Sequence, residues 1–230
     1  MATVVITGAN RGIGLAMTRH YASRGDRVIA LTRDPAASTE LTQLAKGSTA
    51  IGIHAADVTG EASLAAAAKA AGTTAVDIVV CNAGIMSSRG GLADPGYDAA
   101  EWQRVLMTNV AGPFFTARAF LPGLKKATAG KLAIISSMMG SSTQASGNVY
   151  GYRASKAAAA NLGANVAVEL KPMGIAVGIY HPGWVSSDMG GASAPVTPAA
   201  SAKGLVARID TLALATSGVF EDFQGKPYAF

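Results

Sequence analysis

The sequence of 230 residues is long enough for one domain of ordinary size or two small ones. Half of the residues are hydrophobic and 14% are charged, which excludes a disordered or fibrous chain. The net charge is +5, but the basic residues are scattered and Lys125-Lys126 is the only adjacent basic pair, so we expect no nucleic-acid partner. With one cysteine, Cys81, and three histidines that lack ligand spacing, the chain predicts neither an internal disulfide nor a metal site.

The sequence also predicts no membrane association. The N-terminus leads directly into an apolar segment without a basic leader. No uncharged apolar stretch reaches 18 residues, so no membrane span is expected. These features predict a cytoplasmic protein.

Apolar patterning predicts strands and helices that alternate along the chain. In chain order we expect strand 3–7, helix 14–24, strands 27–32 and 51–55, helix 61–71, strand 76–81, helix 101–126, strand 131–136, helix 152–170, strand 175–180, helix 198–215 and a short strand near 227–230. This alternation is typical of an α/β fold in which helices cover both faces of a parallel sheet. Since no linker or repeat interrupts it, we predict a single domain over residues 1–230, with a doubly wound sheet of about seven strands.

A glycine-rich segment, Gly8-Ala9-Asn10-Arg11-Gly12-Ile13-Gly14, joins the first strand to the first helix. Glycine lets the backbone turn sharply and lets its N–H groups approach a phosphate without an intervening Cβ. The helix N-terminus adds a favourable positive partial charge. A tight turn without a ligand is the alternative, but the position between strand and helix favours a dinucleotide site.

The end of the second strand indicates which dinucleotide binds. NAD-preferring folds carry an acidic residue there, which hydrogen-bonds the ribose 2′-hydroxyl, whereas this chain has Thr32 followed by Arg33. Arg33 is suited to binding a 2′-phosphate, and Arg11 is a second candidate cation. Asp34 is expected to face the turn. We therefore predict NADP(H), the alternative being that Arg33 is only a solvated charge.

Tyr152 and Lys156 lie four residues apart in a predicted helix, so their side chains share one face. A tyrosine hydroxyl has a pKa near 10, and a nearby ammonium together with an oxidised nicotinamide would lower it towards a useful range. An incidental surface pair is the alternative. Tyr150 is less suitable because Ala154 stands four residues after it.

Further motifs, together with the glycine-rich loop and the Tyr-Lys pair, give the chain a resemblance to the short-chain dehydrogenase/reductases over roughly residues 3–190. Within that family, the motifs of the chain are most similar to those of the C-factor and carbonyl-reductase branch. The matching positions are Asp57-Val58, Asn82-Ala83-Gly84, Asn109, Ser137, and the segment Pro182-Gly183-Trp184-Val185 with Ser187.

The resemblance implies a single-domain Rossmann fold and an NADPH-dependent oxidoreductase that interconverts a ketone or aldehyde and an alcohol. Ser137 and Tyr152 would hold the carbonyl oxygen, with Tyr152 as general acid. Lys156 would bind the nicotinamide ribose, and Asn109 would hold a proton-relay water. The remaining matching positions are expected to bind the cofactor.

Three further expectations concern the rest of the chain. A substrate lid is expected near residues 186–215, and small-residue helix faces indicate a homodimer or homotetramer. A non-catalytic cofactor sensor on the same fold is one alternative function. A sugar epimerase is a second, for which 230 residues leave little room. The substrate remains open.

Overall fold

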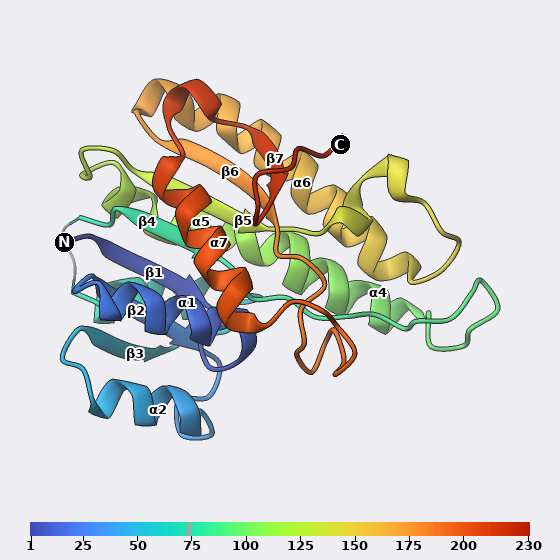
Figure 1. The fold of residues 1–230 in the computed structure, drawn as a ribbon, viewed down its shortest axis with the longest axis horizontal. Coiled ribbons are helices and arrows are strands. Elements are labelled where there is room, and N and C mark those ends of the chain that lie inside the picture. Colours follow the sequence, from blue (N-terminus) through green and yellow to red (C-terminus); the bar gives the residue numbers. More distant parts are fainter. Residues whose placement is uncertain (73–74) are drawn as a thin grey trace.

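The computed structural model describes residues 1–72 and 75–230. Its centre is one seven-stranded sheet in which every pairing between neighbouring strands is parallel, in the order β3-β2-β1-β4-β5-β6-β7 (Figure 1). The strands are β1 (Thr3–Thr7), β2 (Arg27–Thr32), β3 (Ile51–Ala55), β4 (Ile78–Cys81), β5 (Lys131–Ile135), β6 (Ala176–His181) and β7 (Val219–Asp222). The predicted α/β fold class is confirmed.

Helices cover both faces of the sheet. One face carries α1 (Gly12–Ser23), α2 (Thr39–Lys46) and α7 (Pro198–Thr211). The other carries α3 (Glu61–Ala70), α4 (Ala99–Leu106), α5 (Gly112–Leu124) and α6 (Tyr150–Leu170). Short helical turns complete the list: η1 (Met107–Ala111), η2 (Met138–Gly140), η3 (Ser142–Gln144), η4 (Lys171–Met173) and η5 (Leu214–Thr216). None of the described helices is long and apolar enough to cross a membrane.

The inner strands are buried on both faces because their side chains alternate between two hydrophobic cores. In β1, Val5 packs with the core under α3, α5 and α6. Its neighbours Val4 and Ile6 pack with the core under α1, α2 and α7. This two-sided burial explains why the strands read as continuous β-branched runs, and it holds the strand ends rigidly.

The last strand was predicted in the wrong place. It is β7, not residues 227–230, where Pro227 makes only an isolated antiparallel bridge with Glu221. Two acidic residues, Glu221 and Asp222, stand at the end of β7. Because acidic residues are rare in strands, the sequence pattern there predicts a turn. Both are nevertheless buried, and the Arg208 guanidinium donates to Glu221 from 2.7 and 3.0 Å.

The remaining differences concern helices. The predicted helix 101–126 is α4 and α5 joined by the π-helical turn η1, so the segment is helical but not uniform. α2 is a helix that the apolar pattern does not predict, because Leu41 is its only fully buried residue. α7 ends at Thr211, four residues before the predicted end.

Candidate active site

The strand order reverses between β1 and β4, so the segments that follow these two strands diverge and leave a crevice at the carboxyl edge of the sheet. Two residues brace this point. The Thr7 hydroxyl accepts hydrogen bonds from the backbone N–H groups of Asn82 and Ala83, each at 3.0 Å. The Asn82 amide donates to the carbonyls of Thr7 (3.0 Å) and Gly8 (3.2 Å). The Asn-Ala-Gly segment therefore fixes the glycine-rich loop against β4.

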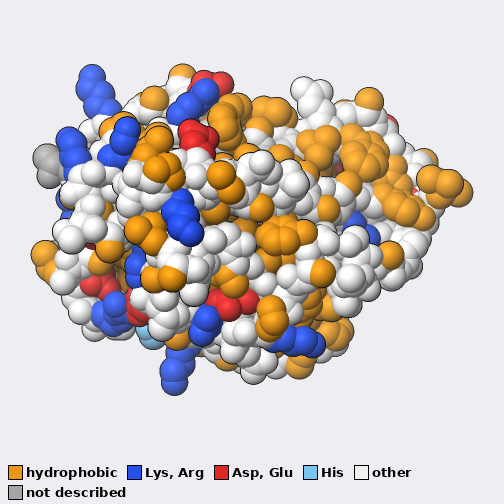
Figure 2. Space-filling model, turned by 90° about the horizontal axis from the view of Figure 1, so that it is seen from above, with side chains coloured by type: hydrophobic (Ala, Val, Ile, Leu, Met, Phe, Trp, Pro, Cys, Tyr) orange, Lys and Arg blue, Asp and Glu red, His pale blue; other side chains and the backbone are white. Residues whose placement is uncertain are grey.

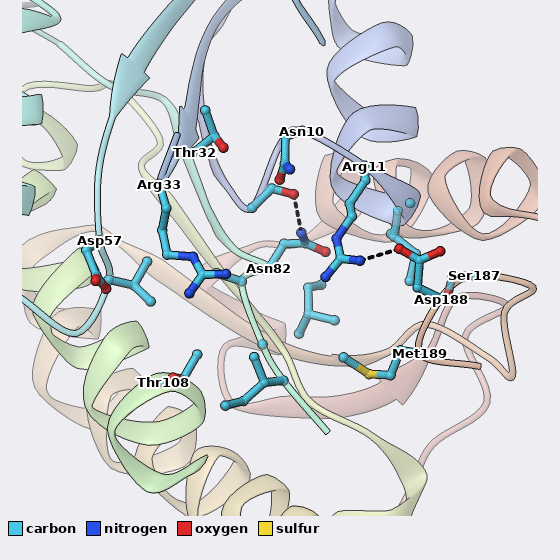
Figure 3. Close-up of a pocket in the computed structure, with 18 of the residues that line it drawn as sticks. Asn10, Arg11, Thr32, Arg33, Asp57, Asn82, Thr108, Ser187, Asp188 and Met189 are labelled. Atoms are coloured by element: carbon cyan, nitrogen blue, oxygen red, sulfur yellow. Dashed lines mark hydrogen bonds and ion pairs between the residues drawn. The ribbon is translucent and has the colours of Figure 1, made fainter. Parts of the chain in front are cut away.

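A cavity of about 1280 Å³ occupies this crevice (Figure 3). Most of the predicted site residues line it, although they come from segments far apart in the sequence. They are Gly8, Asn10, Arg11, Gly12, Ile13, Thr32, Arg33, Asp57, Val58, Asn82, Ala83, Gly84, Tyr152, Lys156, Pro182 and Ser187.

The glycine-rich loop presents backbone N–H groups to the cavity. Gly8 and Gly12 have φ values of +63° and +54°, which side chains with a Cβ rarely adopt. No side chain caps the N-terminus of α1, whose N-cap is Arg11, so the first N–H groups of the helix remain available to a ligand. Gly14 has a different role, because a Cβ there would meet the Gly8 carbonyl oxygen at 2.1 Å.

The three residues at the end of β2, Thr32, Arg33 and Asp34, have different surroundings, as the sequence predicts. Thr32 is buried and its hydroxyl lies 3.1 Å from that of Ser38. Asp34 faces the turn, where its carboxylate accepts from the backbone N–H groups of Ala36 (2.9 Å) and Ala37 (3.1 Å). Arg33 is exposed and points into the cavity (Figure 3). It is thus a cation of the cavity wall that lacks the acidic residue of NAD-preferring folds beside it at position 32.

The other candidate cation has a partner. The Arg11 guanidinium forms an ion pair with Asp188 across the cavity, joining the glycine-rich loop to the segment after β6 (Figure 3). Both side chains are largely exposed. Arg11 therefore bridges two walls of the cavity in this structure.

Asp57 and Val58 form the wall beyond β3. The Asp57 carboxylate accepts from the backbone N–H (2.9 Å) and the hydroxyl (2.8 Å) of Thr59. These bonds, and then the charge of Arg33, hold the pKa of Asp57 below its ordinary value. Val58 is buried, and a Cβ on Gly112 would meet its side chain at 3.0 Å.

Tyr152 and Lys156 lie together on the buried face of α6 and both line the cavity. The Lys156 ammonium is 5.6 Å from the centroid of the Tyr152 ring, and it donates to the Ile135 carbonyl at 2.9 Å. Ser137 is also buried and follows β5, next to the carboxyl edge of the sheet. The i, i+4 spacing therefore brings the predicted proton-transfer pair into the crevice.

Burial controls the protonation of this pair. It raises the pKa of Tyr152 to about 12, against smaller opposing effects from a hydrogen bond with Ser137 and the positive charge of Arg89. It lowers the pKa of Lys156 to about 8. At Tyr152, desolvation outweighs both of the opposing effects, and the lowering of the Tyr152 pKa expected from Lys156 together with an oxidised nicotinamide stays a prediction. The hydroxyl is held protonated, which is the form of a proton donor.

Asn109 lies in the π-helical turn η1, and π turns inside helices are common at functional sites. Its amide donates to the Ile85 carbonyl and to the Ser155 hydroxyl, both at 2.9 Å, and its carbonyl accepts from the Ile85 N–H at 2.9 Å. Ser155 in turn donates to the Tyr152 carbonyl at 2.7 Å. Asn109 thus ties the segment after β4 to the buried face of α6.

Several predicted residues do not line the cavity itself. Ser137 directly follows Ser136 and Asn109 directly follows Thr108, both of which line the cavity, and Gly14 packs inside the loop. Gly183 has a φ of +86°, and a Cβ there would meet the Phe223 ring at 2.9 Å. Val185 is buried and bridges to Val196. Among the described residues, no group of three His, Cys, Asp or Glu side chains is placed to hold a metal.

Other residues of the site were not singled out from the sequence. Thr108 and Arg104 line the cavity from η1 and α4, and Asp188 and Met189 line it from the segment after β6. Ser87 accepts a hydrogen bond from the Tyr152 N–H at 2.9 Å. The one available signal was position: Thr108 directly precedes Asn109 in the sequence.

Comparisons with known proteins place this geometry in a family. The sequence profile of the short chain dehydrogenase family matches residues 2–196. The C-signal protein of Myxococcus xanthus is 36% identical over 154 residues, 66% of this chain and 92% of the relative. The 1-hydroxy-2-glutathionyl-2-methyl-3-butene dehydrogenase of Rhodococcus sp. (strain AD45) is 34% identical over 235 residues, 98% of each chain.

A solved structure matches the whole molecule. The NADPH-bound carbonyl reductase from chicken fatty liver is 32% identical, with a TM-score of 0.93 over 100% of this chain and 99% of that chain. The predicted resemblance is confirmed. The chain belongs to the short chain dehydrogenase family and is an oxidoreductase of that family.

Proposed function

We propose that this oxidoreductase is an NADPH-dependent carbonyl reductase, which interconverts a ketone or aldehyde and an alcohol with Tyr152 as general acid and base. The observation that carries the proposal is the buried pair of Tyr152 and Lys156 on the cavity wall, with the buried Ser137 side chain close enough to Tyr152 to oppose the rise in its pKa. A cofactor sensor has no need of such a proton-transfer group.

The residues present fit a phosphorylated dinucleotide. The uncapped N-terminus of α1 and the glycines with positive φ form a donor cradle for a pyrophosphate. Arg33 offers a guanidinium for a 2′-phosphate, Thr32 replaces the carboxylate of NAD-preferring folds, and the Asp34 carboxylate is hydrogen-bonded within its own turn. When bound, NADPH supplies the hydride that the carbonyl carbon accepts.

The chain's own residues then have distinct roles. Ser137 orients the carbonyl oxygen, and Tyr152 donates the proton that this oxygen gains on reduction. Lys156, held by the Ile135 carbonyl, would contact the nicotinamide ribose and favour the phenolate left behind. Asn109 is a positioning residue in this proposal, since it acts on α6 through Ser155.

A panel of aldehydes, ketones and quinones, assayed by NADPH oxidation, tests the proposal. We expect turnover of at least one compound class with NADPH. If the protein binds NADPH but reduces nothing in the panel, the sensor function is favoured instead.

A further inference from the structure

Arg89 lies in the loop between β4 and α4 and is held over the start of α6. On one side of it the Ser87 hydroxyl accepts from the Tyr152 N–H at 2.9 Å. On the other side, the Gly90 carbonyl accepts from the Val149 N–H at 3.4 Å and from the Tyr97 hydroxyl at 3.0 Å. The backbone on both sides of Arg89 is therefore tied to the helix that carries Tyr152.

The Arg89 side chain reaches a residue of the cavity wall. Its guanidinium donates to the Met189 carbonyl at 2.6 Å, and Met189 and Tyr152 both line the cavity. Its positive charge is close enough to the Tyr152 hydroxyl to oppose the rise in the pKa of that group. Arg89 is thus joined to the cavity wall and acts electrostatically on Tyr152.

This cation lacks a counter-charge. Within residues 1–72 and 75–230, no ion pair includes Arg89. Asp94 in the same loop accepts from the backbone N–H groups of Gly90 (3.0 Å) and Gly96 (2.8 Å), and Asp188 is paired with Arg11. A guanidinium has five N–H donors in a planar fork that matches a carboxylate, and the contact with Met189 uses one.

We propose that Arg89 is a specificity-determining residue that binds a carboxylate on the substrate, so that the preferred substrates are carbonyl compounds bearing a carboxylate close to the carbonyl group. This inference rests on the proposed function. Hydrophobic side chains gather in Figure 2 at the end of the molecule that carries the loops 86–98 and 141–149 in Figure 1. That surface suits an aromatic or aliphatic remainder of the substrate.

Benzoylformate and its methyl ester are a matched pair of probes, since they share the ketone and the ring and differ in the charge. We expect the parent protein to prefer benzoylformate. Arg89→Gln should raise KM for benzoylformate by about 10- to 100-fold, as expected for a charge-assisted pair, and change that for the ester by less than about 3-fold. The value of kcat should change little for either compound, and Arg89→Lys should recover part of the loss.

Arg19→Gln is the control, because it removes an equal charge from an exposed position on α1, which covers the face of the sheet opposite to α6. It should leave both KM values unchanged. Equal losses for benzoylformate and its ester in Arg89→Gln would overturn the proposal, as would a parent protein that prefers the ester.

A binding measurement separates this inference from the proposed function. Benzoate and benzamide are titrated into the protein saturated with NADP⁺, where no turnover is needed. Benzoate binding that disappears in Arg89→Gln would support the carboxylate site even if no carbonyl compound were reduced. Equal affinity for benzoate and benzamide in the parent protein would overturn it even if carbonyl compounds were reduced.

Discussion

Burial works against the charge that Lys156 carries at neutral pH. Its pKa falls from an ordinary value of 10.5 to about 8, so between these values the unfolded chain binds more protons than the folded chain. The free energy of unfolding therefore rises with pH across this window. Active sites typically contain groups of this kind, which lower the stability of the fold and are kept for function.

Lys156→Met should consequently stabilise the protein below pH 8, by about 1–3 kcal/mol after the loss of the donor to the Ile135 carbonyl is deducted. The gain should shrink as the pH approaches 10.5. Urea unfolding at pH 7 and pH 10 measures it, and circular dichroism checks the fold. The account would be contradicted if Lys156→Met had a lower free energy of unfolding than the parent at pH 7 but not at pH 10.

Arg33 should determine the choice between the two dinucleotides. In Arg33→Asp the loss of a phosphate partner and the new negative charge should lower the ratio of kcat/KM for NADPH over NADH by at least about 10-fold. Arg19→Asp is the charge-matched control. A parent protein that uses NADPH and NADH with equal efficiency would refute the assignment.

The two arginines show what a sequence does and does not reveal about a site. Arg33 was predicted from its position after a strand, and the structure places it in the cavity. Arg11 was predicted as a second candidate cation, and the sequence did not show that it pairs with Asp188, 177 residues away in the chain. No local pattern reports such a contact. The same holds for Arg89 and the Met189 carbonyl.

At the scale of elements, the loop between β1 and α1 has two kinds of glycine. At Gly12 a Cβ would meet nothing closer than the Ser187 Cβ at 3.9 Å, so the open space beside it belongs to the cavity. At Gly14 a Cβ would collide with the Gly8 carbonyl oxygen. The first position is therefore constrained by its φ and by the ligand, and the second by packing.

We expect Gly12→Val to abolish NADPH binding while the protein remains folded, at a cost of about 1–3 kcal/mol for the left-handed backbone. Gly14→Ala should instead lower the stability of the protein itself. Calorimetry with NADPH and thermal unfolding distinguish the two. Unchanged NADPH affinity in Gly12→Val would show that the loop does not approach the cofactor.

Elements with strong patterns were predicted well, and those shaped by tertiary contacts were not. The inner strands β1, β2, β4, β5 and β6 were predicted because nearly all of their residues are buried and apolar, whereas the edge strand β3 is only partly buried. The π turn η1 was missed, since its apolar spacing resembles an ordinary helix and the change of pitch depends on the contacts of Asn109. β7 was missed because the Arg208 ion pair compensates a buried glutamate.

At the scale of the whole molecule, α5 and α6 cover the same face of the sheet and expose apolar side chains. Phe114 is 42% exposed and Val168 is 77% exposed. We propose that two copies pair through this face, so light scattering should give twice the 23.1 kDa of the chain. Val168→Glu should reduce that mass to the monomer value. A monomeric parent protein would rule the pairing out.

The central claim is that Tyr152 transfers the proton in carbonyl reduction. Tyr152→Phe keeps the ring and removes the hydroxyl, whereas Tyr150→Phe removes a hydroxyl that donates to the Gly147 carbonyl at 2.9 Å. The deciding measurement is kcat with NADPH and the best carbonyl compound, alongside NADPH affinity. We predict at least about 100-fold slower turnover for Tyr152→Phe, with NADPH affinity unchanged, and nearly parental turnover for Tyr150→Phe. Parental turnover in Tyr152→Phe would contradict the account.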